Sequence, residues 1–278
     1  MKPEKNNARE KLEILLVADV HMGPSNTTRP GEETPDLMER FAKEINTVIK
    51  PDILVELGDR VNNFNHEEDR RNALRFSEII RSLCLPYYLV LGNHDLHNLT
   101  KEENKEIFGA EVGRRTSYAN GFKLIFLDTE EPVIEGVGGN ISEEQLKWLS
   151  VELNSEETPK IVFGHHPVDN QVISENPHFL QFPHLAFVKN RERARDLIES
   201  GKNVLAYVNG HVHWFSFEVG EKIPFISVPS FTEAWPEKKG APGMFAKLSV
   251  SMNGNVEVAV GSLSPRRTLG KFLWTKQH

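Results

Sequence analysis

The segment LEILLVADVH, residues 12–21, decides the fold of this chain. Its apolar run, Ile14 to Ala18, is typical of a buried parallel strand. The run leads directly into Asp19 and His21, two residue types that commonly bind metal ions. In open α/β sheets, ligands bind beyond the carboxyl ends of the strands. The segment therefore predicts an α/β protein with a polar site at the edge of a sheet.

Four more polar motifs follow apolar runs further along the chain. They are GD at 58–59, GNHD at 92–95, GHH at 164–166 and GHVH at 210–213. The apolar runs that precede them predict parallel strands at 53–57, 87–91, 161–163 and 204–208. With the first segment, these motifs supply the candidate metal ligands Asp19, His21, Asp59, Asn93, His165, His211 and His213. Such a set of oxygen and imidazole donors is too large for one tetrahedral ion and suits two borderline metal ions.

The ordered pattern DxH, GD, GNHD, GHH and GHxH resembles the calcineurin-like metallophosphoesterase superfamily, from about Leu12 to Phe217. Among its members, the small bacterial cyclic-nucleotide and glycerophosphodiester phosphodiesterases are the most similar type. The resemblance implies an α/β fold, a four-layer α/β/β/α sandwich in which two facing mixed sheets are flanked by helices. It also implies that a metal-bridging hydroxide attacks a phosphodiester.

The same resemblance divides the ligands between two metal ions, which are Fe, Mn or Zn. It assigns Asp19, His21, Asp59 and His213 to the first ion. It assigns Asp59, Asn93, His165 and His211 to the second, so that Asp59 bridges the pair. The i, i+2 spacing of Asp19 and His21, and of His211 and His213, would point each pair the same way on a regular strand.

Further residues are candidates for catalysis and substrate binding. By resemblance, His94 contacts phosphate and assists departure of the leaving group. Asn93 is a candidate for substrate binding as well as a metal ligand. Asp95 either orients the His94 ring or forms a cap or turn hydrogen bond. His166 either contacts substrate or merely packs, and Asn62 is expected to line the pocket. The loop at 167–188 either overhangs the site or is an ordinary surface excursion.

The remaining pattern places the other elements. Helices are expected at 36–50, 67–83, 142–153 and 191–200, the third opened by a capping box at 142–145. Asn120-Gly121 predicts a hairpin. After His213, strands at 214–219, 225–228, 245–252 and 256–263 suggest a second, mostly antiparallel sheet. We therefore expect a flexible leader at 1–11, a single metallophosphoesterase domain at 12–263 and a C-terminal tail at 264–278.

Composition limits the class of protein. The 278 residues carry a net charge of −7, which argues against nucleic acid as a partner except as a substrate, so a small phosphorylated substrate is expected. The single cysteine, Cys84, falls on an apolar helical face, which suggests a buried thiol in a reducing, cytoplasmic compartment. No apolar stretch is long enough for a membrane span. The sequence leaves open whether the protein forms a homo-oligomer.

Three alternatives to a phosphodiesterase also remain open at this point. The chain could be a phosphomonoesterase or a nuclease of the same superfamily. It could instead be a non-catalytic, metal-bound interaction module. A module of that kind would be expected to lose metal ligands, and none of the family's ligand positions departs from the pattern here.

Overall fold

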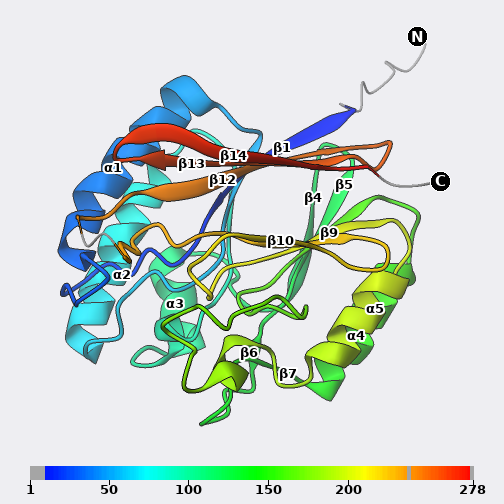
Figure 1. Cartoon of the computed structure of the whole chain (residues 1–278), viewed down its shortest axis with the longest axis horizontal. Helices are drawn as coiled ribbons and strands as arrows, with labels where there is room; N and C mark the ends of the chain where they lie inside the picture. Colours follow the sequence, from blue (N-terminus) through cyan, green and yellow to red (C-terminus); the bar gives the residue numbers. More distant parts are fainter. Residues whose placement is uncertain (1–9, 237–238, 276–278) are drawn as a thin grey trace.

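Two six-stranded mixed sheets face each other at the centre of the protein, with helices on both outer sides (Figure 1). A computed structural model describes residues 10–236 and 239–275. The strand order is β14-β13-β12-β1-β2-β3 in the first sheet and β10-β11-β9-β8-β5-β4 in the second. The predicted four-layer α/β/β/α sandwich is confirmed.

The first sheet contains β1 (Lys11–Val17), β2 (Ile53–Glu56), β3 (Tyr87–Leu89), β12 (Met244–Ser251), β13 (Val256–Leu263) and β14 (Arg266–Trp274). The second contains β4 (Arg115–Ala119), β5 (Phe122–Phe126), β8 (Lys160–Phe163), β9 (Val204–Asn209), β10 (Ser216–Val219) and β11 (Pro224–Ser227). The small strands β6 (Glu130–Glu131) and β7 (Asn140–Ile141) pair separately. The helices are α1 (Thr34–Glu44), α2 (His66–Arg81), α3 (Lys101–Phe108), α4 (Glu143–Asn154) and α5 (Arg191–Ser200).

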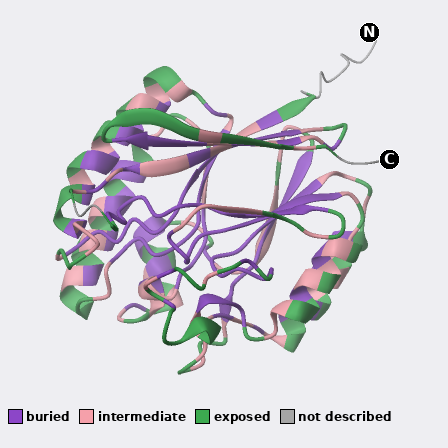
Figure 2. Ribbon diagram, in the orientation of Figure 1, coloured by how far each residue is buried: buried purple, intermediate pink, exposed green. Residues whose placement is uncertain are grey.

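Strand β1 shows how the sequence pattern produces the layers. Ile14 and Leu16 point into the apolar layer between the sheets, whereas Leu15 and Val17 join the layer beneath α1 and α2. All four side chains are fully buried, because successive residues of a strand face opposite sides and both sides are covered. Figure 2 shows the buried residues concentrated in the strands between the outer helices. The continuous apolar run is thus explained by burial on both faces.

Polar side-chain caps mark the start of α2, α3 and α4. Ser142 opens α4 by accepting a hydrogen bond from the Gln145 backbone at 3.1 Å. The side chain of Gln145 bonds the backbone of Asp128 instead of closing the expected capping box. A complete capping box occurs at α3, between Thr100 and Glu103.

The sequence pattern identified most strands but assigned some of them to the wrong sheet. The five motif strands divide between the sheets, with β1, β2 and β3 in the first and β8 and β9 in the second. The strands after His213 do not form a sheet of their own. Strand β12 pairs antiparallel with β1, whereas β11 pairs parallel with β9. Apolar alternation specifies which face is buried but carries little information about which strand lies alongside.

The chain ends differ from the expected domain limits. Strand β14 extends the first sheet past residue 263 by pairing antiparallel with β13, so residues 266–274 of the expected tail belong to the sheet. Residues 1–9 of the expected leader lie outside the described residues, and Lys11 already belongs to β1.

Cys84 is exposed, so the prediction of a buried thiol was wrong. Helix α2 ends at Arg81, and Cys84 therefore lies beyond the apolar helical face on which it was placed. In the described part of the chain, no helix combines the length and the apolar character that crossing a membrane requires.

A buried ion cluster connects the turns that follow β2 and β3. The carboxylate of Asp95 accepts hydrogen bonds from the backbone of Asp59 and Arg60 at 2.9 Å and of Gly92 at 3.0 Å. The fully buried Arg60 places Nη2 3.0 Å from Asp95 and also pairs with Glu56. Each buried charge therefore has partners of opposite sign or a backbone donor, as burial of charge requires.

We expect Asp95→Asn to lower the free energy of unfolding by roughly 3–5 kcal/mol, because it leaves a buried guanidinium short of one partner. Urea denaturation in excess chelator measures this without a contribution from cation binding. Asp196→Asn is the matched control, because that side chain is 73% exposed. Equal unfolding midpoints for the two variants would contradict the structural role of Asp95.

Candidate metal centre

Five of the candidate ligands lie in left-handed turns just beyond the strands. Their φ angles are 54° for Asp19, 47° for His21, 60° for Asp59, 70° for His211 and 63° for His213. Such φ values are uncommon outside glycine, and backbone strain of this kind clusters at functional sites. The side chains of each i, i+2 pair were expected to point the same way because of alternation along a strand. That explanation was wrong, since the pairs converge through left-handed turns.

Two glycines allow the turns to approach each other closely. A Cβ atom at Gly58, where φ is 102°, would lie 2.7 Å from His165 Nδ1. A Cβ atom at Gly92 would lie 2.2 Å from Asp59 Oδ1. A side chain at either position would displace a candidate ligand, so the GD and GNHD motifs need glycine for close packing around the site.

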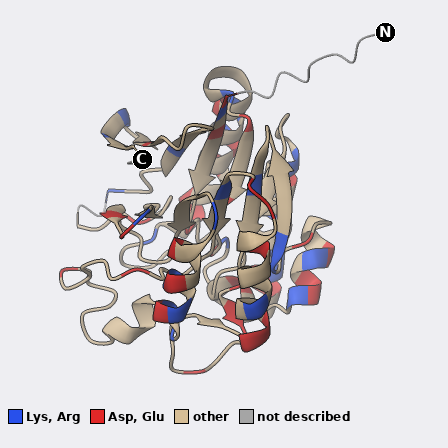
Figure 3. Ribbon diagram, turned by 90° about the vertical axis from the view of Figure 1, so that its right-hand side faces the viewer, with Lys and Arg blue, Asp and Glu red and all other residues tan. Residues whose placement is uncertain are grey.

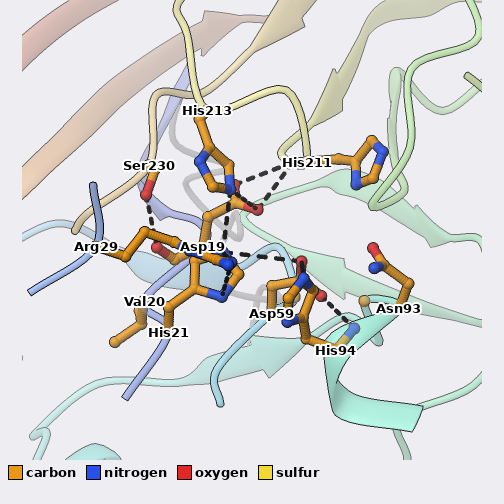
Figure 4. Close-up of polar contacts among 12 residues, drawn as sticks. Asp19, Val20, His21, Arg29, Asp59, Asn93, His94, His211, His213 and Ser230 are labelled. Carbon is orange, nitrogen blue, oxygen red and sulfur yellow. Dashed lines mark hydrogen bonds and ion pairs between the residues drawn. The ribbon is translucent and has the colours of Figure 1, made fainter. Parts of the chain in front are cut away.

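The first group of ligands meets beside β1. His21 Nε2 lies 3.0 Å from His213 Nε2, which lies 3.7 Å from Asp19 Oδ1 (Figure 4). Asp19 is fixed in turn, because its carboxylate accepts from the backbone of His211 at 3.0 and 3.1 Å. The structure thus brings together Asp19, His21 and His213, the terminal ligands predicted for the first metal.

The second group lies on the other side of Asp59. Asp59 Oδ2 is 3.3 Å from His165 Nε2, and that nitrogen is 3.2 Å from Asn93 Oδ1. The rings of His165 and His211 are 5.0 Å apart between centroids. Asp59 Oδ2 is also 4.0 Å from His21 Nε2 of the first group. This carboxylate oxygen therefore faces both groups, as a shared ligand would.

In each of three imidazole rings, one nitrogen forms a hydrogen bond with the surrounding protein. His165 uses Nδ1 at 2.7 Å, His211 uses Nε2 at 2.9 Å and His213 uses Nδ1 at 2.9 Å. Their respective acceptors are the carbonyl oxygens of Leu57 and Leu185 and the carboxylate of Glu233. In His211 and His213 the bond places the ring proton on the bonded nitrogen and leaves the lone pair of the other nitrogen for a cation. His165 differs, because Asp59, against the effect of burial, raises the pKa of this ring to about 10, so its Nε2 gives up a proton when a cation binds.

The electrostatics of the site also fit cations. Burial lowers the pKa of His211 to about 3 and that of His213 to about 4, so both rings are neutral at pH 7. Burial raises the pKa of Asp19 well above its usual range. Against the effect of burial, the imidazoles, foremost His165, hold the pKa of Asp59 well below its usual range. Divalent ions bind neutral imidazoles and ionised carboxylates, so His211, His213 and Asp59 are already in the binding form, whereas Asp19 loses its proton when an ion binds.

The candidate catalytic residues have different surroundings. His94 lies beside the ligands, with its backbone donating to Asp59 Oδ1 at 2.8 Å and its ring centroid 4.6 Å from that of His21. Its Nδ1 is buried without a hydrogen-bond partner among the described residues. Asp95 does not orient this ring, because its carboxylate binds backbone amides and Arg60. Of the two roles expected for Asp95, the structure contains the turn hydrogen bonds.

Of the two further candidates for substrate contact, His166 lines the cavity and Asn62 does not. His166 lines the cavity above the ligands, with Nδ1 2.9 Å from Thr129 Oγ1 and Nε2 3.5 Å from Glu130 Oε1. Asn62 donates to the Pro24 carbonyl at 2.7 Å and is not one of the described residues that line the cavity. The structure therefore gives no support to a substrate contact from Asn62.

The cavity has a volume of about 260 Å³ and is bordered by loop 167–188, which contributes His178, Phe179 and Leu185. The loop therefore overhangs the site and is not an ordinary surface excursion. A larger cavity of about 640 Å³ lies at α5 and β10 and contains none of the candidate ligands.

Two residues of the site were not identified from the sequence. Arg29 lines the cavity, and Glu233 accepts from both His213 and His178, the latter at 2.8 Å. Glu233 follows β11, whose parallel pairing with β9 places its carboxyl end near the same edge. The rule that ligands follow parallel strands would have identified Glu233 if β11 had been recognised as parallel.

Comparisons with known proteins agree with this geometry. The model of the calcineurin-like phosphoesterase family matches residues 12–215. A protein of Arcobacter nitrofigilis, named as a probable glycerophosphodiester phosphodiesterase, is 30% identical over 70% of each chain. A probable cyclic nucleotide phosphodiesterase of Synechococcus is 24% identical over 72% of this chain and 76% of its own.

A solved structure shares the fold over nearly the whole chain. It is a dimetal phosphatase from Danio rerio, with a TM-score of 0.73, 17% identity, and coverage of 96% of this chain and 99% of that one. The match of the family model and the identity to the Arcobacter protein together assign the family. The chain belongs to the calcineurin-like phosphoesterases, metal-dependent hydrolases that use a dinuclear metal centre.

Proposed function

We propose that the protein hydrolyses a phosphodiester at a dinuclear centre held by the seven predicted ligands. One observation carries this proposal: Asp59 Oδ2 lies 3.3 Å from His165 and 4.0 Å from His21, and so faces both ligand groups. A carboxylate in this position can neutralise two cations at once. The names of the two curated relatives, a glycerophosphodiester phosphodiesterase and a cyclic nucleotide phosphodiesterase, support a diester as substrate.

Fe, Mn or Zn fits the mixed oxygen and imidazole donors. Such ions supply charge stabilisation of phosphoryl oxygens and a hydroxide nucleophile at neutral pH. The protein provides the rest. Glu233, Leu185 and Leu57 fix the orientation of three imidazole rings. His94 directs its ring toward the cavity, where Nε2 can donate a hydrogen bond to the oxygen of the leaving alcohol.

The alternatives have less support. A non-catalytic module does not require His94 in the cavity beside a complete ligand set. A nuclease acting on long chains would benefit from a basic surface, but the net charge is −7. Figure 3 shows acidic and basic residues intermingled on the helices facing the viewer, consistent with pairs such as Arg193 and Glu143. We also propose a cytoplasmic location, which fits a small phosphorylated substrate.

The test of the substrate class is a comparison of initial rates with Mn²⁺ present. The panel contains cyclic nucleotides, glycerophosphodiesters, phosphomonoesters and single-stranded DNA. We expect the highest kcat/KM with a small diester. Higher kcat/KM with every monoester, or the absence of hydrolysis together with the absence of tightly bound transition metal, would contradict the proposal.

We predict that His94→Ala retains both metals and lowers kcat by roughly 10²–10⁴-fold, because a positioned proton donor is lost while the seven ligands remain. Elemental analysis and steady-state kinetics measure the two effects separately. His66→Ala is the control, because His66 is an exposed histidine paired with Glu103 outside the cavity. Unchanged kcat in His94→Ala would remove this residue from the mechanism.

We predict that Asp59→Asn abolishes paired metal occupancy, whereas His213→Ala weakens mainly one site. The Asn substitution removes negative charge that faces both ligand groups, so repulsion between the cations is no longer offset. His213 belongs to one group only. Metal stoichiometry and activity titrated with Mn²⁺ distinguish the variants. Two tightly held ions and near-normal turnover in Asp59→Asn would rule out the bridging role.

A further inference from the structure

Arg29 extends into the cavity from the loop between β1 and α1, a segment outside the ligand motifs. The turn that carries it is fixed, because Asn26 Oδ1 accepts from the backbone of Thr28 at 3.1 Å and of Arg29 at 2.9 Å. The Thr28 carbonyl also accepts from the Ala234 backbone at 2.8 Å. The position of Arg29 is therefore set by the fold and is not that of a freely moving surface side chain.

The guanidinium lies next to the ligands yet has no ion-pair partner in the described part of the chain. Its Nη1 is 3.3 Å from His21 Nδ1, and its Nε is buried without a hydrogen-bond partner. Three carboxylates lie near enough to favour its charge, those of Asp59, Glu233 and Asp19, but each is engaged elsewhere. Asp59 accepts from the His94 backbone and pairs with His165, Asp19 accepts from the backbone of His211, and Glu233 pairs with His178 and His213. A largely buried, unpaired positive charge is costly unless an anion binds to it.

The cavity lining agrees with an anionic ligand. Arg29 is the one Lys or Arg among the described residues that line it. The remaining lining combines the candidate metal and catalytic residues with an apolar wall formed by Val137, Phe179 and Leu185. A guanidinium offers several N–H donors in a planar fork, a geometry that matches phosphoryl oxygens. The cavity thus combines a donor for a charged group, Arg29, with apolar side chains for a less polar group.

We propose that Arg29 is a substrate-binding residue that donates hydrogen bonds to a non-bridging phosphoryl oxygen. This inference rests on the proposed function for the identity of the anion as a phosphoryl group. It adds a positive charge from the protein itself to the charge that the metals supply. The same contact holds the phosphomonoester product, whose phosphoryl group carries more negative charge than a diester and is bound by Arg29 at least as well.

The test measures binding of inorganic phosphate to the Mn²⁺-saturated protein by calorimetry, in Arg29→Met, Arg29→Lys and the parent. We expect Arg29→Met to raise the Kd for phosphate about tenfold or more, which is the usual effect of losing a hydrogen bond to a charged group. Arg29→Lys should be intermediate, because it keeps the charge and loses the fork. Arg193→Met is the matched control on an exposed helix face and should bind phosphate like the parent.

A purely structural role, in which Arg29 only holds His21, gives a different result. Removing a nearby positive charge should leave Mn²⁺ affinity unchanged or increase it. Weaker Mn²⁺ binding together with unchanged phosphate affinity at saturating Mn²⁺ would overturn the proposal. Phosphate binding needs no turnover, so it tests Arg29 separately from the function. A parent without diesterase activity whose phosphate binding still depends on Arg29 would contradict the proposed function and support the anion site.

Discussion

The carboxylate of Asp95 determines how the two central ligand turns are arranged. It accepts three backbone hydrogen bonds, two from the turn after β2 and one from the turn after β3, and it faces the buried Arg60. Neighbouring parallel strands bring these turns near each other, but strand pairing ends before Asp59 and Asn93 are reached. Asp95 continues the connection where the sheet stops. The position of Asp59, and with it the relation between the two ligand groups, depends on this contact.

A second carboxylate has the corresponding role on the opposite side of the cavity. Glu233 Oε2 lies 2.9 Å from His213 Nδ1, 2.8 Å from His178 Nε2 and 3.3 Å from Thr28 Oγ1. It therefore joins a candidate metal ligand, the overhanging loop and the turn that carries Arg29. Because one acceptor serves all three, a change in the overhanging loop alters the hydrogen bond that sets the tautomer of His213. A candidate metal ligand, the overhanging loop and the Arg29 turn are physically coupled through this side chain.

The sequence predicted the motif strands, the layers and the identity of the clustered ligands, because burial on two faces and ligand chemistry are local properties of the chain. It did not predict that β12 lies beside β1, since pairing depends on the whole assembly. Glu233 and Arg29 were missed for the same reason: each acts on residues distant in sequence, and neither lies in a motif. The role of Asp95 was ambiguous because a carboxylate one residue after His94 can serve either that ring or the backbone.

Assembly of this site without cations is energetically unfavourable. Left-handed φ angles at five ligand residues cost of order 1–3 kcal/mol each, and burial opposes ionisation of Asp19. The surrounding structure must offset these costs in advance, and it does so with interactions that do not use the metal-binding atoms. The Asp95–Arg60 pair, the carbonyls of Leu57 and Leu185, and Glu233 each hold a ligand from behind. The lone pairs that face the cavity are thus already oriented, so that the free energy of cation binding is not spent on organising the ligands.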